Sequence, residues 1–354
     1  MELNNFIFAI FIIIFGYFLN YYLLLIFNKS KTNLLIDGQF KKPQAFHEAL
    51  TYRLGGLSFS ILLSLVFLYL FIYKNILSIE YISFCALFFL IGFADDLEIN
   101  IRPKFRLIIM IFFLLALIIY NNFKLDRISV EYLDNLMSID LFALFFVTLC
   151  FLLIINGSNL IDGINGLLCL HTFIIFSILF SINIKSGNQS FSLLLFYICL
   201  ITLITIKFNF PKAQMFLGDA GAYLLGALIA VSTIMSNNLN TSISSFFFSI
   251  LLFYLFFEVF FSFFRKIFYA KQNPLLPDNK HLHMLLYKYL LKKNRKQISN
   301  YKVSIYINLT YIFLIIPPFI LMKNSLFCKI YFLSLPIIYI YFYIMINKKL
   351  KKIN

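Results

Sequence analysis

The chain has 354 residues, of which 62% are hydrophobic and 13% charged, and Lys and Arg outnumber Asp and Glu by 30 to 15. Soluble domains carry about 25% charged residues, so the composition excludes an ordinary soluble protein. The sequence predicts an integral membrane protein, in which the basic excess sets topology and meets anionic lipid rather than nucleic acid. The five cysteines lie in or beside apolar runs without paired spacing, so we expect neither disulfides nor a zinc site.

Apolar runs recur along the whole chain, and a membrane span needs about 17–25 such residues. We predict an all-α, polytopic membrane protein with a single transmembrane domain over residues 1–354. The first run has no basic segment before it and no small-residue cleavage site, so we expect a retained span. The eleven predicted spans lie near 5–27, 55–73, 77–94, 105–120, 139–155, 164–183, 190–206, 220–236, 243–264, 303–322 and 325–346.

The distribution of basic residues predicts the orientation of these spans. With the N-terminus outside, 24 of the 30 Lys and Arg residues fall on inner segments and 6 on outer ones. Inner loops of membrane proteins carry such an excess, so we expect a cytoplasmic C-terminus. The polar motifs then fall on cytoplasmic loops at about 28–54, 94–105, 156–166, 207–219 and 265–302.

Three carboxylates lie where predicted spans meet these loops. Asp219, in FLGDAG, precedes an apolar helix, and Asp95 and Asp96 follow one. A carboxylate at a membrane boundary is costly unless a cation or a substrate stabilises it. Adjacent carboxylates repel, so the pair favours a proton acceptor or a metal ligand, although charges at a helix end would look the same.

A second motif, NGSNLIDGINGL, combines amide side chains, a carboxylate and glycines. Asn159, Asp162 and Asn165 have the donors and acceptors needed to read a base or a sugar. A polar turn rich in capping residues explains the motif equally well. Phe216 is a candidate for stacking on a planar base, but it is one of 47 phenylalanines.

Basic and histidine side chains complete the candidate set. Arg53, Lys104 and Arg106 are suited to phosphate, although interfacial Lys and Arg commonly only extend towards water. His281 and His283 share a face if the loop is extended, and they suit a metal or pyrophosphate. Solvated loop histidines are the simpler interpretation. Glu258 lies within an apolar run of the ninth predicted span. A carboxylate inside a membrane span is a functional candidate by default.

These motifs, in this order, resemble the polyprenyl-phosphate N-acetylhexosamine-1-phosphate transferase superfamily. The resemblance covers about residues 37–283. The loop PDNKHLH is more similar to the sugar-nucleotide branch than to the pentapeptide translocase. Five positions depart from the pattern, and they bear on sugar specificity more than on the class of reaction: Leu50, Tyr52, Asn165, Met284 and Glu258, the last in place of Asp.

The resemblance implies a bacterial inner-membrane enzyme that transfers a HexNAc 1-phosphate from a UDP-sugar to undecaprenyl phosphate and releases UMP. It implies Mg²⁺, with Mn²⁺ as an alternative, held by Asp219 and by Asp95. Asp95, Asp96 and Asp219 are the implied catalytic residues. The implied substrate-binding residues are Asn159, Asp162, Asn165, Phe216, Arg53, Lys104, Arg106, His281 and His283. The product would start a lipid-linked surface glycan such as an O-antigen or a wall polymer.

Two other classes of protein stay open. A secondary transporter also uses intramembrane carboxylates, but its sites lie near the bilayer midplane, whereas these motifs lie at span ends. A polytopic scaffold gives no reason for several polar motifs to share one face. The sequence leaves open the donor sugar, the polyprenyl length and a homodimeric state.

Overall fold

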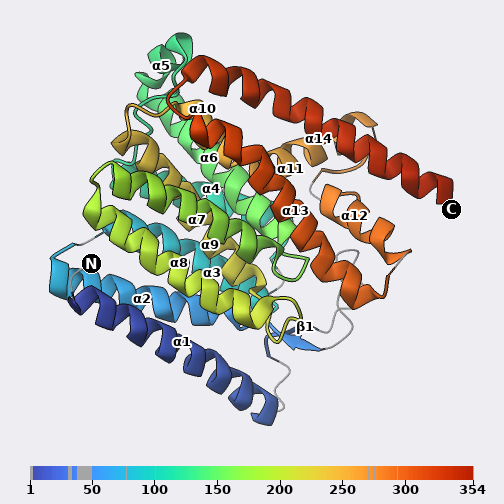
Figure 1. Ribbon diagram of the computed structural model, residues 1–354, viewed down its shortest axis with the longest axis horizontal. Helices are drawn as coiled ribbons and strands as arrows, with labels where there is room; N and C mark the ends of the chain where they lie inside the picture. The colour runs from blue at the N-terminus through green and yellow to red at the C-terminus, as the bar shows by residue number, and fades with distance from the viewer. Residues whose placement is uncertain are drawn as a thin grey trace.

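The computed structural model describes residues 3–30, 34–37, 50–76, 78–99, 101–269, 271–274, 276, 278–292 and 294–353. It is a bundle of long helices whose axes run broadly in one direction (Figure 1). A two-stranded antiparallel ribbon, β1 (Ile36–Asp37) with β2 (Thr51–Tyr52), lies at one end of the bundle. The all-α prediction is confirmed. Much of the predicted loop 28–54, including His47, lies outside the described residues.

The helices follow the predicted spans closely. They are α1 (Leu3–Ser30), α2 (Gly55–Lys74), α3 (Ile79–Asp96), α4 (Pro103–Tyr120), α5 (Glu131–Met137), α6 (Asp140–Ile161), α7 (Leu167–Lys185), α8 (Gln189–Asn209), α9 (Gly218–Leu239), α10 (Ser245–Leu251), α11 (Phe253–Phe264), α12 (Leu282–Leu291), α13 (Lys296–Ile320) and α14 (Ser325–Ile353), with one π-helical turn, η1 (Arg265–Tyr269).

Within the described residues, nine helices are long and apolar enough to span a membrane, and the bent pair α10–α11 makes a tenth. The remaining predicted span is α3, an 18-residue helix whose acidic residues lie only at its two ends. The chain is therefore a multi-pass membrane protein. The ninth predicted span differs from expectation, because a bend of 70° separates α10 from the helix that follows it.

Helix α9 lies at the centre of the bundle. Of its most apolar 18-residue window, 89% is buried, against 17% for the peripheral helices α1 and α14. Close packing is possible because small residues face one another: a Cβ on Gly56 would collide with the main chain of Gly221, and one on Gly92 would collide with the main chain at Asp219. Such residues let membrane helices approach closely, so α2 and α3 press directly on the start of α9.

A basic residue caps the C-terminal end of α9. The Nη2 atom of Arg127 donates to the main-chain oxygens of Asn240 and Ile243 at 2.8 and 2.6 Å, and it lies 3.4 Å from that of Asn237. A cation suits the negative end of a helix dipole. Hydrogen bonds from Asn240 to Asn183, and from Asn183 to Ser236, extend this polar network.

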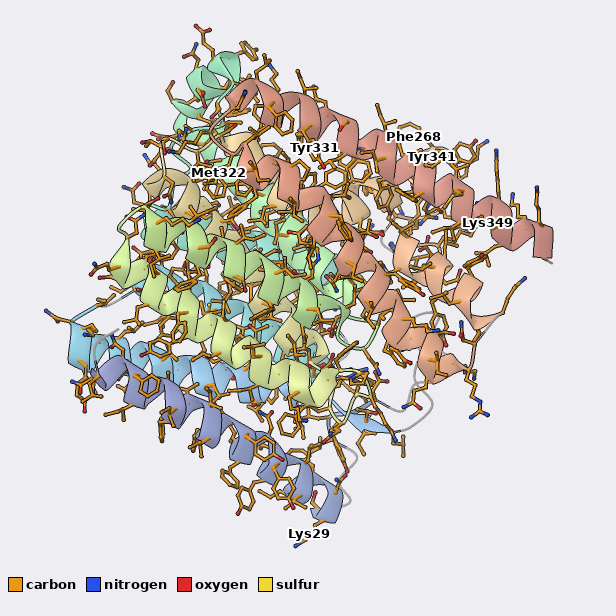
Figure 2. All side chains as sticks on the ribbon, viewed as in Figure 1. Lys29, Phe268, Met322, Tyr331, Tyr341 and Lys349 are labelled. Carbon is orange, nitrogen blue, oxygen red and sulfur yellow. The ribbon has the colours of Figure 1, made fainter. Side chains whose placement is uncertain are left out.

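The side chains separate two ends of the bundle. Lys29 of α1 and Lys349 of α14 lie towards the end that carries β1, whereas Met322 lies towards the opposite end (Figure 2). Between the ends, many large apolar side chains of α1, α4 and α14 are exposed. Exposed apolar surface on these helices is what a lipid-facing belt requires.

Candidate active site

Asp96 holds the start of α9. Its two carboxylate oxygens accept the main-chain N–H groups of Asp219, at 3.0 Å, and of Ala220, at 2.9 Å. The first N–H groups of a helix lack partners within the helix, so a carboxylate there stabilises both the hydrogen bonds and the dipole. Gly218 has a φ of 72°, and a Cβ at that position would collide with the Asp96 carboxylate. Asp96 is 1% exposed, so this contact is buried.

Arg53 reaches the same place from the segment before α2. Its guanidinium lies 3.1 Å from the Asp37 carboxylate and 3.5 Å from that of Asp96. Main-chain bonds fix this position: the N–H of Phe216 donates to the oxygen of Tyr52 at 2.9 Å. The N–H of Gly55 donates back to the oxygen of Phe216 at 2.8 Å. The segments containing Arg53 and Phe216 are therefore joined side by side just before α9.

Asp95 and Arg106 form the third part of this cluster. The Asp95 carboxylate accepts a hydrogen bond from the Arg106 guanidinium, which is also an ion pair. The Arg106 Cζ atom lies 5.8 Å from the centre of the Tyr223 ring, one turn into α9. Arg106 also interacts electrostatically with Asp219. The turn between α3 and α4 is thereby held against the start of α9.

The loop after α6 brings Asp162 and Asn159 to the cluster. Asp162 interacts electrostatically with Asp219, Asp96 and Arg53. Burial, followed by the two neighbouring carboxylates, raises the pKa of Asp162 well above its ordinary value. Asn159 lies beside Tyr223. The predicted residues of this loop thus share one site with Asp219.

Asn165 holds the same loop in place. Its main-chain N–H donates to Asn300 Oδ1 at 2.9 Å, and its main-chain oxygen accepts from Ser304 Oγ at 2.6 Å. Its side-chain amide donates to the oxygen of Pro211 at 3.3 Å. The residue therefore links α13 to the segment before α9. Its position fits the predicted substrate-binding loop, and its own bonds are to the protein.

The Asp219 carboxylate is an available acidic group of the cluster. It is only partly buried, and no hydrogen bond or ion pair joins it to another described side chain. Among the residues that the structure describes, no three His, Cys, Asp or Glu side chains could hold a metal ion by themselves. Mg²⁺ takes one or two carboxylates and fills its shell with water and substrate oxygens, so Asp219 fits such an ion as a partial site. Asp95 is already engaged by Arg106.

His281 and His283 belong to a separate buried cluster around Glu258 of α11. His281 Nδ1 lies 3.1 Å from Glu258 Oε2, and its Nε2 lies 3.2 Å from Asp278 Oδ1. Asp278 also accepts a hydrogen bond from Arg265 at 2.7 Å. His283 is fully buried, 3.5 Å from the Tyr254 hydroxyl. No hydrogen bond or ion pair among the described residues joins this cluster to Asp219.

Some residues of the site were not predicted, and one predicted residue stays apart. Lys104 is exposed at the start of α4, and no ion pair connects it to the described cluster. Asp37, Tyr223 and Asp278 were not predicted, although each touches a predicted residue. Asp37 and Asp278 are two of only 15 acidic residues, and that scarcity was the available signal. Tyr223 is one of 22 tyrosines and gave none.

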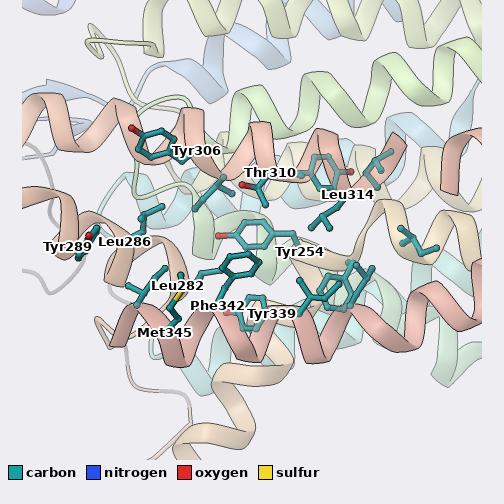
Figure 3. A pocket seen from close by; sticks show the side chains of 18 of the residues that line it. Tyr254, Leu282, Leu286, Tyr289, Tyr306, Thr310, Leu314, Tyr339, Phe342 and Met345 are labelled. Atoms are coloured by element: carbon teal, nitrogen blue, oxygen red, sulfur yellow. The ribbon is translucent and has the colours of Figure 1, made fainter. Parts of the chain in front are cut away.

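An apolar cavity of about 300 Å³ lies between α11, α12, α13 and α14. Figure 3 shows Tyr254 and Tyr339 among the side chains that line it, together with residues such as Leu282 and Phe342. The cavity adjoins the histidine cluster, because Tyr254 and Tyr339 also interact with Glu258. It does not include any of the four clustered carboxylates.

Residues 78–237 match the model of glycosyl transferase family 4. This part of the chain, which is less than half of it, is similar to that family. It contains the α3, α6 and α9 motifs, so the predicted superfamily is confirmed. Arg53, His281 and His283 lie outside the matched residues.

Similar proteins come from both branches of the superfamily. One is the undecaprenyl-phosphate alpha-N-acetylglucosaminyl 1-phosphate transferase of Thermotoga maritima, 27% identical over 55% of this chain and 57% of that protein. The phospho-N-acetylmuramoyl-pentapeptide-transferase of Helicobacter hepaticus is 30% identical over 44% and 53%, and that of Clostridium botulinum strain Eklund 17B is 25% identical over 40% and 47%. The chain matches about half the length of these relatives. With its helices, these likenesses identify a multi-pass protein of the bacterial inner membrane.

Proposed function

We propose that the protein transfers an N-acetylhexosamine 1-phosphate from a UDP-sugar to polyprenyl phosphate, with undecaprenyl phosphate as the acceptor, and releases UMP. The supporting observation is the meeting of four carboxylates and two arginines at the start of α9. They are Asp95, Asp96, Asp162, Asp219, Arg53 and Arg106. The family match and the names of these relatives, which are all sugar-phosphate transferases, agree with this reaction.

Asp219 is our candidate for holding Mg²⁺, because its carboxylate is partly exposed and no hydrogen bond or ion pair joins it to another described side chain. Once bound, the ion would neutralise charge on the phosphate oxygens of the donor. Around it, Arg53 and Arg106 supply the positive charge that two anionic substrates need in order to approach each other. Their bonds to Asp37 and Asp95 hold the guanidinium groups in place before substrate arrives. Positioning of this kind supplies much of the rate in phosphoryl transfer.

Asp95 and Asp96 receive different roles in this proposal. Asp96 has both oxygens occupied by main-chain N–H groups, so we assign it to positioning Asp219. Asp95 is held by the Arg106 side chain. We assign its carboxylate to acting on the lipid phosphate and removing its proton. Asn159 interacts with Tyr223, Asp162 interacts with Asp219, and Phe216 precedes α9. These three residues are our candidates for contacts with the nucleoside.

The place of the cluster argues against a transporter. Asp96 ends α3, Asp162 follows α6 and Asp219 begins α9, so all three lie at helix ends. A coupling-ion site would lie near the midplane of the bundle. A transferase needs its carboxylates at the bilayer surface, where a water-soluble donor meets a lipid acceptor. Helix-end placement therefore favours the transferase.

Purified protein in lipid nanodiscs tests the proposal. We expect UMP and a lipid-pyrophosphoryl sugar from undecaprenyl phosphate and one member of a UDP-HexNAc panel, with GlcNAc, GalNAc, QuiNAc and FucNAc derivatives included. EDTA should stop the reaction, and Mg²⁺ or Mn²⁺ should restore it. No product from any donor, with a folded protein, would contradict the proposal. A product only from UDP-MurNAc-pentapeptide would instead assign the protein to the translocase branch.

A further inference from the structure

The cluster around Glu258 contains a histidine with an unusual pair of neighbours. His281 is 3% exposed, and each of its ring nitrogens faces a carboxylate oxygen. Nδ1 lies 3.1 Å from Glu258, which comes from α11, and Nε2 lies 3.2 Å from Asp278, which comes from the loop before α12. The imidazole therefore bridges a helix and a loop that follows it in the chain.

The charge of the ring follows from the chemistry of these neighbours. An ionised carboxylate only accepts hydrogen bonds, and a neutral imidazole has only one N–H donor. Donors from the protein favour the ionised form of both carboxylates: Asp278 also accepts from Arg265 at 2.7 Å, and Glu258 accepts the main-chain N–H of Leu282 at 3.1 Å. Both ring nitrogens of His281 must therefore carry hydrogen. With His281 and Arg265 positive, the charges of the buried Glu258 and the partly buried Asp278 are balanced.

We propose that His281 is a cationic positioning residue that ties the loop before α12 to α11, and that it does not bind substrate. The loop has further ties: the buried Lys266 Nζ donates to the oxygens of Pro274, at 3.2 Å, and Leu276, at 2.6 Å. The kinetic part of this inference rests on the proposed transfer reaction. The charge state of His281 does not.

The element that His281 places is α12. Glu258 accepts the first N–H group of this helix, so its charge also meets the positive end of the helix dipole. The His283 ring, in the first turn, stacks on the His281 ring with centres 5.7 Å apart. Removing the positive charge from His281 leaves Glu258 and Asp278 facing each other without a cation between them. We expect α12 to loosen from α11 in that state.

The contact that His281 makes between α11 and the loop before α12 depends on pH. The groups that face the ring determine whether this contact is lost at high or at low pH. Glu258 of α11, Asp278 of the loop and His283 of α12 face the ring, while Arg265 faces Asp278 and Tyr339 of α14 faces Glu258. Burial lowers the pKa of His281, but the hydrogen bonds and charges of Asp278 and Glu258 outweigh it and raise the pKa above its ordinary value. The contribution of His281 to this contact is therefore fully present below the ordinary pKa of histidine and is lost as pH rises through the raised pKa.

The first test measures the charge directly. The chain has only four histidines, His47, His171, His281 and His283, so ¹⁵N-labelled imidazole signals can be assigned with single His→Gln variants. We expect the His281 signal to be that of an imidazolium at pH 7.5, and to become neutral at a lower pH in Asp278→Asn. Burial lowers the pKa of His283 to about 4, so its signal should be neutral. A neutral His281 at pH 7 would overturn the proposal.

The second test separates positioning from substrate binding. Asp278→Asn should move the alkaline fall of kcat to lower pH. At a pH above the pKa of His281 in both proteins, kcat should be about tenfold lower for each unit by which that pKa falls, while KM for the donor stays within about twofold. His281→Arg keeps a cation with several donors, so it should retain more activity than His281→Gln and lose the alkaline fall. A KM for the donor that rises at every pH in both His281 variants would overturn the proposal.

Controls keep the two proposals apart. Asp126→Asn removes one exposed carboxylate at the opposite end of the bundle and should leave the pH profile unchanged. If the wild-type protein has no transferase activity, the reaction proposed above fails while the imidazole signals still decide the charge of His281. If activity is present but its pH profile is the same in Asp278→Asn, the positioning role fails alone.

Discussion

Asp219 is the residue on which the proposed chemistry depends most. It begins the central helix, its main-chain N–H is held by Asp96, and no hydrogen bond or ion pair joins its carboxylate to another described side chain. Asp219→Asn keeps the size and hydrogen-bonding capacity of the side chain and removes the charge. We expect insertion and thermal unfolding to be unchanged and transfer to be abolished, measured as UMP release. Asp126→Asn is the matched control, and metal-dependent activity in Asp219→Asn would contradict the assignment.

Asp162 should make the fold less stable at neutral pH. Burial and the nearby charges of Asp219 and Asp96 raise its pKa, so the folded protein holds its proton more tightly than the unfolded chain. Its contribution to stability is therefore present at low pH and lost as pH rises through the raised pKa. In EDTA, Asp162→Asn should unfold at a higher temperature than wild type at pH 8, and the difference should shrink towards pH 4. A difference that is constant with pH would contradict this.

Single residues could be predicted from the sequence where their side-chain type is rare in the chain. They could not be predicted where the packing of distant segments determines their role. Asp95, Asp96, Asp162 and Asp219 stood out because carboxylates are rare in an apolar chain. Nothing in the spacing indicated that Asp96 would hold main-chain N–H groups of α9, because the two segments are 123 residues apart. The three-dimensional packing of α3 against α9 determines that role.

At the scale of elements, the contact between α3 and α9 sets the geometry of the site. Gly92 lies at a close approach of the two helices, since a Cβ there would collide with the main-chain oxygen of Asp219. Gly92→Ala should push α3 away, lower the free energy of unfolding by about 1–3 kcal/mol and reduce turnover. Thermal unfolding and UMP release measure the two effects.

Gly187→Ala is the control for this substitution. Gly187 has open space around it and a φ of 81°, so alanine there brings local backbone strain far from the carboxylates. That variant should lose some stability and keep its turnover. If Gly92→Ala behaves in the same way, α3 does not control the site.

The elements themselves were largely predictable. Runs of apolar residues gave ten of the spans as single helices, because no water is present in a bilayer to satisfy a broken main chain. The exception is residues 243–264, where a mostly apolar run contains the 70° bend between α10 and α11. No Pro or Gly marks this bend. The short helices α5 and α12 lie in polar segments and had no span-length signal.

For the whole molecule, the excess of basic residues on one set of loops predicts the orientation in the membrane. A reporter that is active only in the cytoplasm, fused after Asn354, should be active. Asp126→Cys, at the opposite end of the bundle, should react with a membrane-impermeant thiol reagent added to intact cells. The native cysteines lie within helices, and the parent protein serves as the control. An inactive fusion, together with an Asp126→Cys variant that the reagent does not label, would reverse the topology.

Opposite charges fix the two ends of the central helix. A carboxylate, Asp96, binds its first turn, and a guanidinium, Arg127, binds its last carbonyl groups. A helix held in this way resists sliding along its axis, so bilayers of different thickness should leave it in place. Any mismatch should instead be absorbed by tilting of the lipid-exposed α1 and α14, which are only 17% buried. The depth of the carboxylate cluster relative to the membrane surface would then change little with lipid chain length, so one enzyme could work in membranes whose lipids vary with growth temperature.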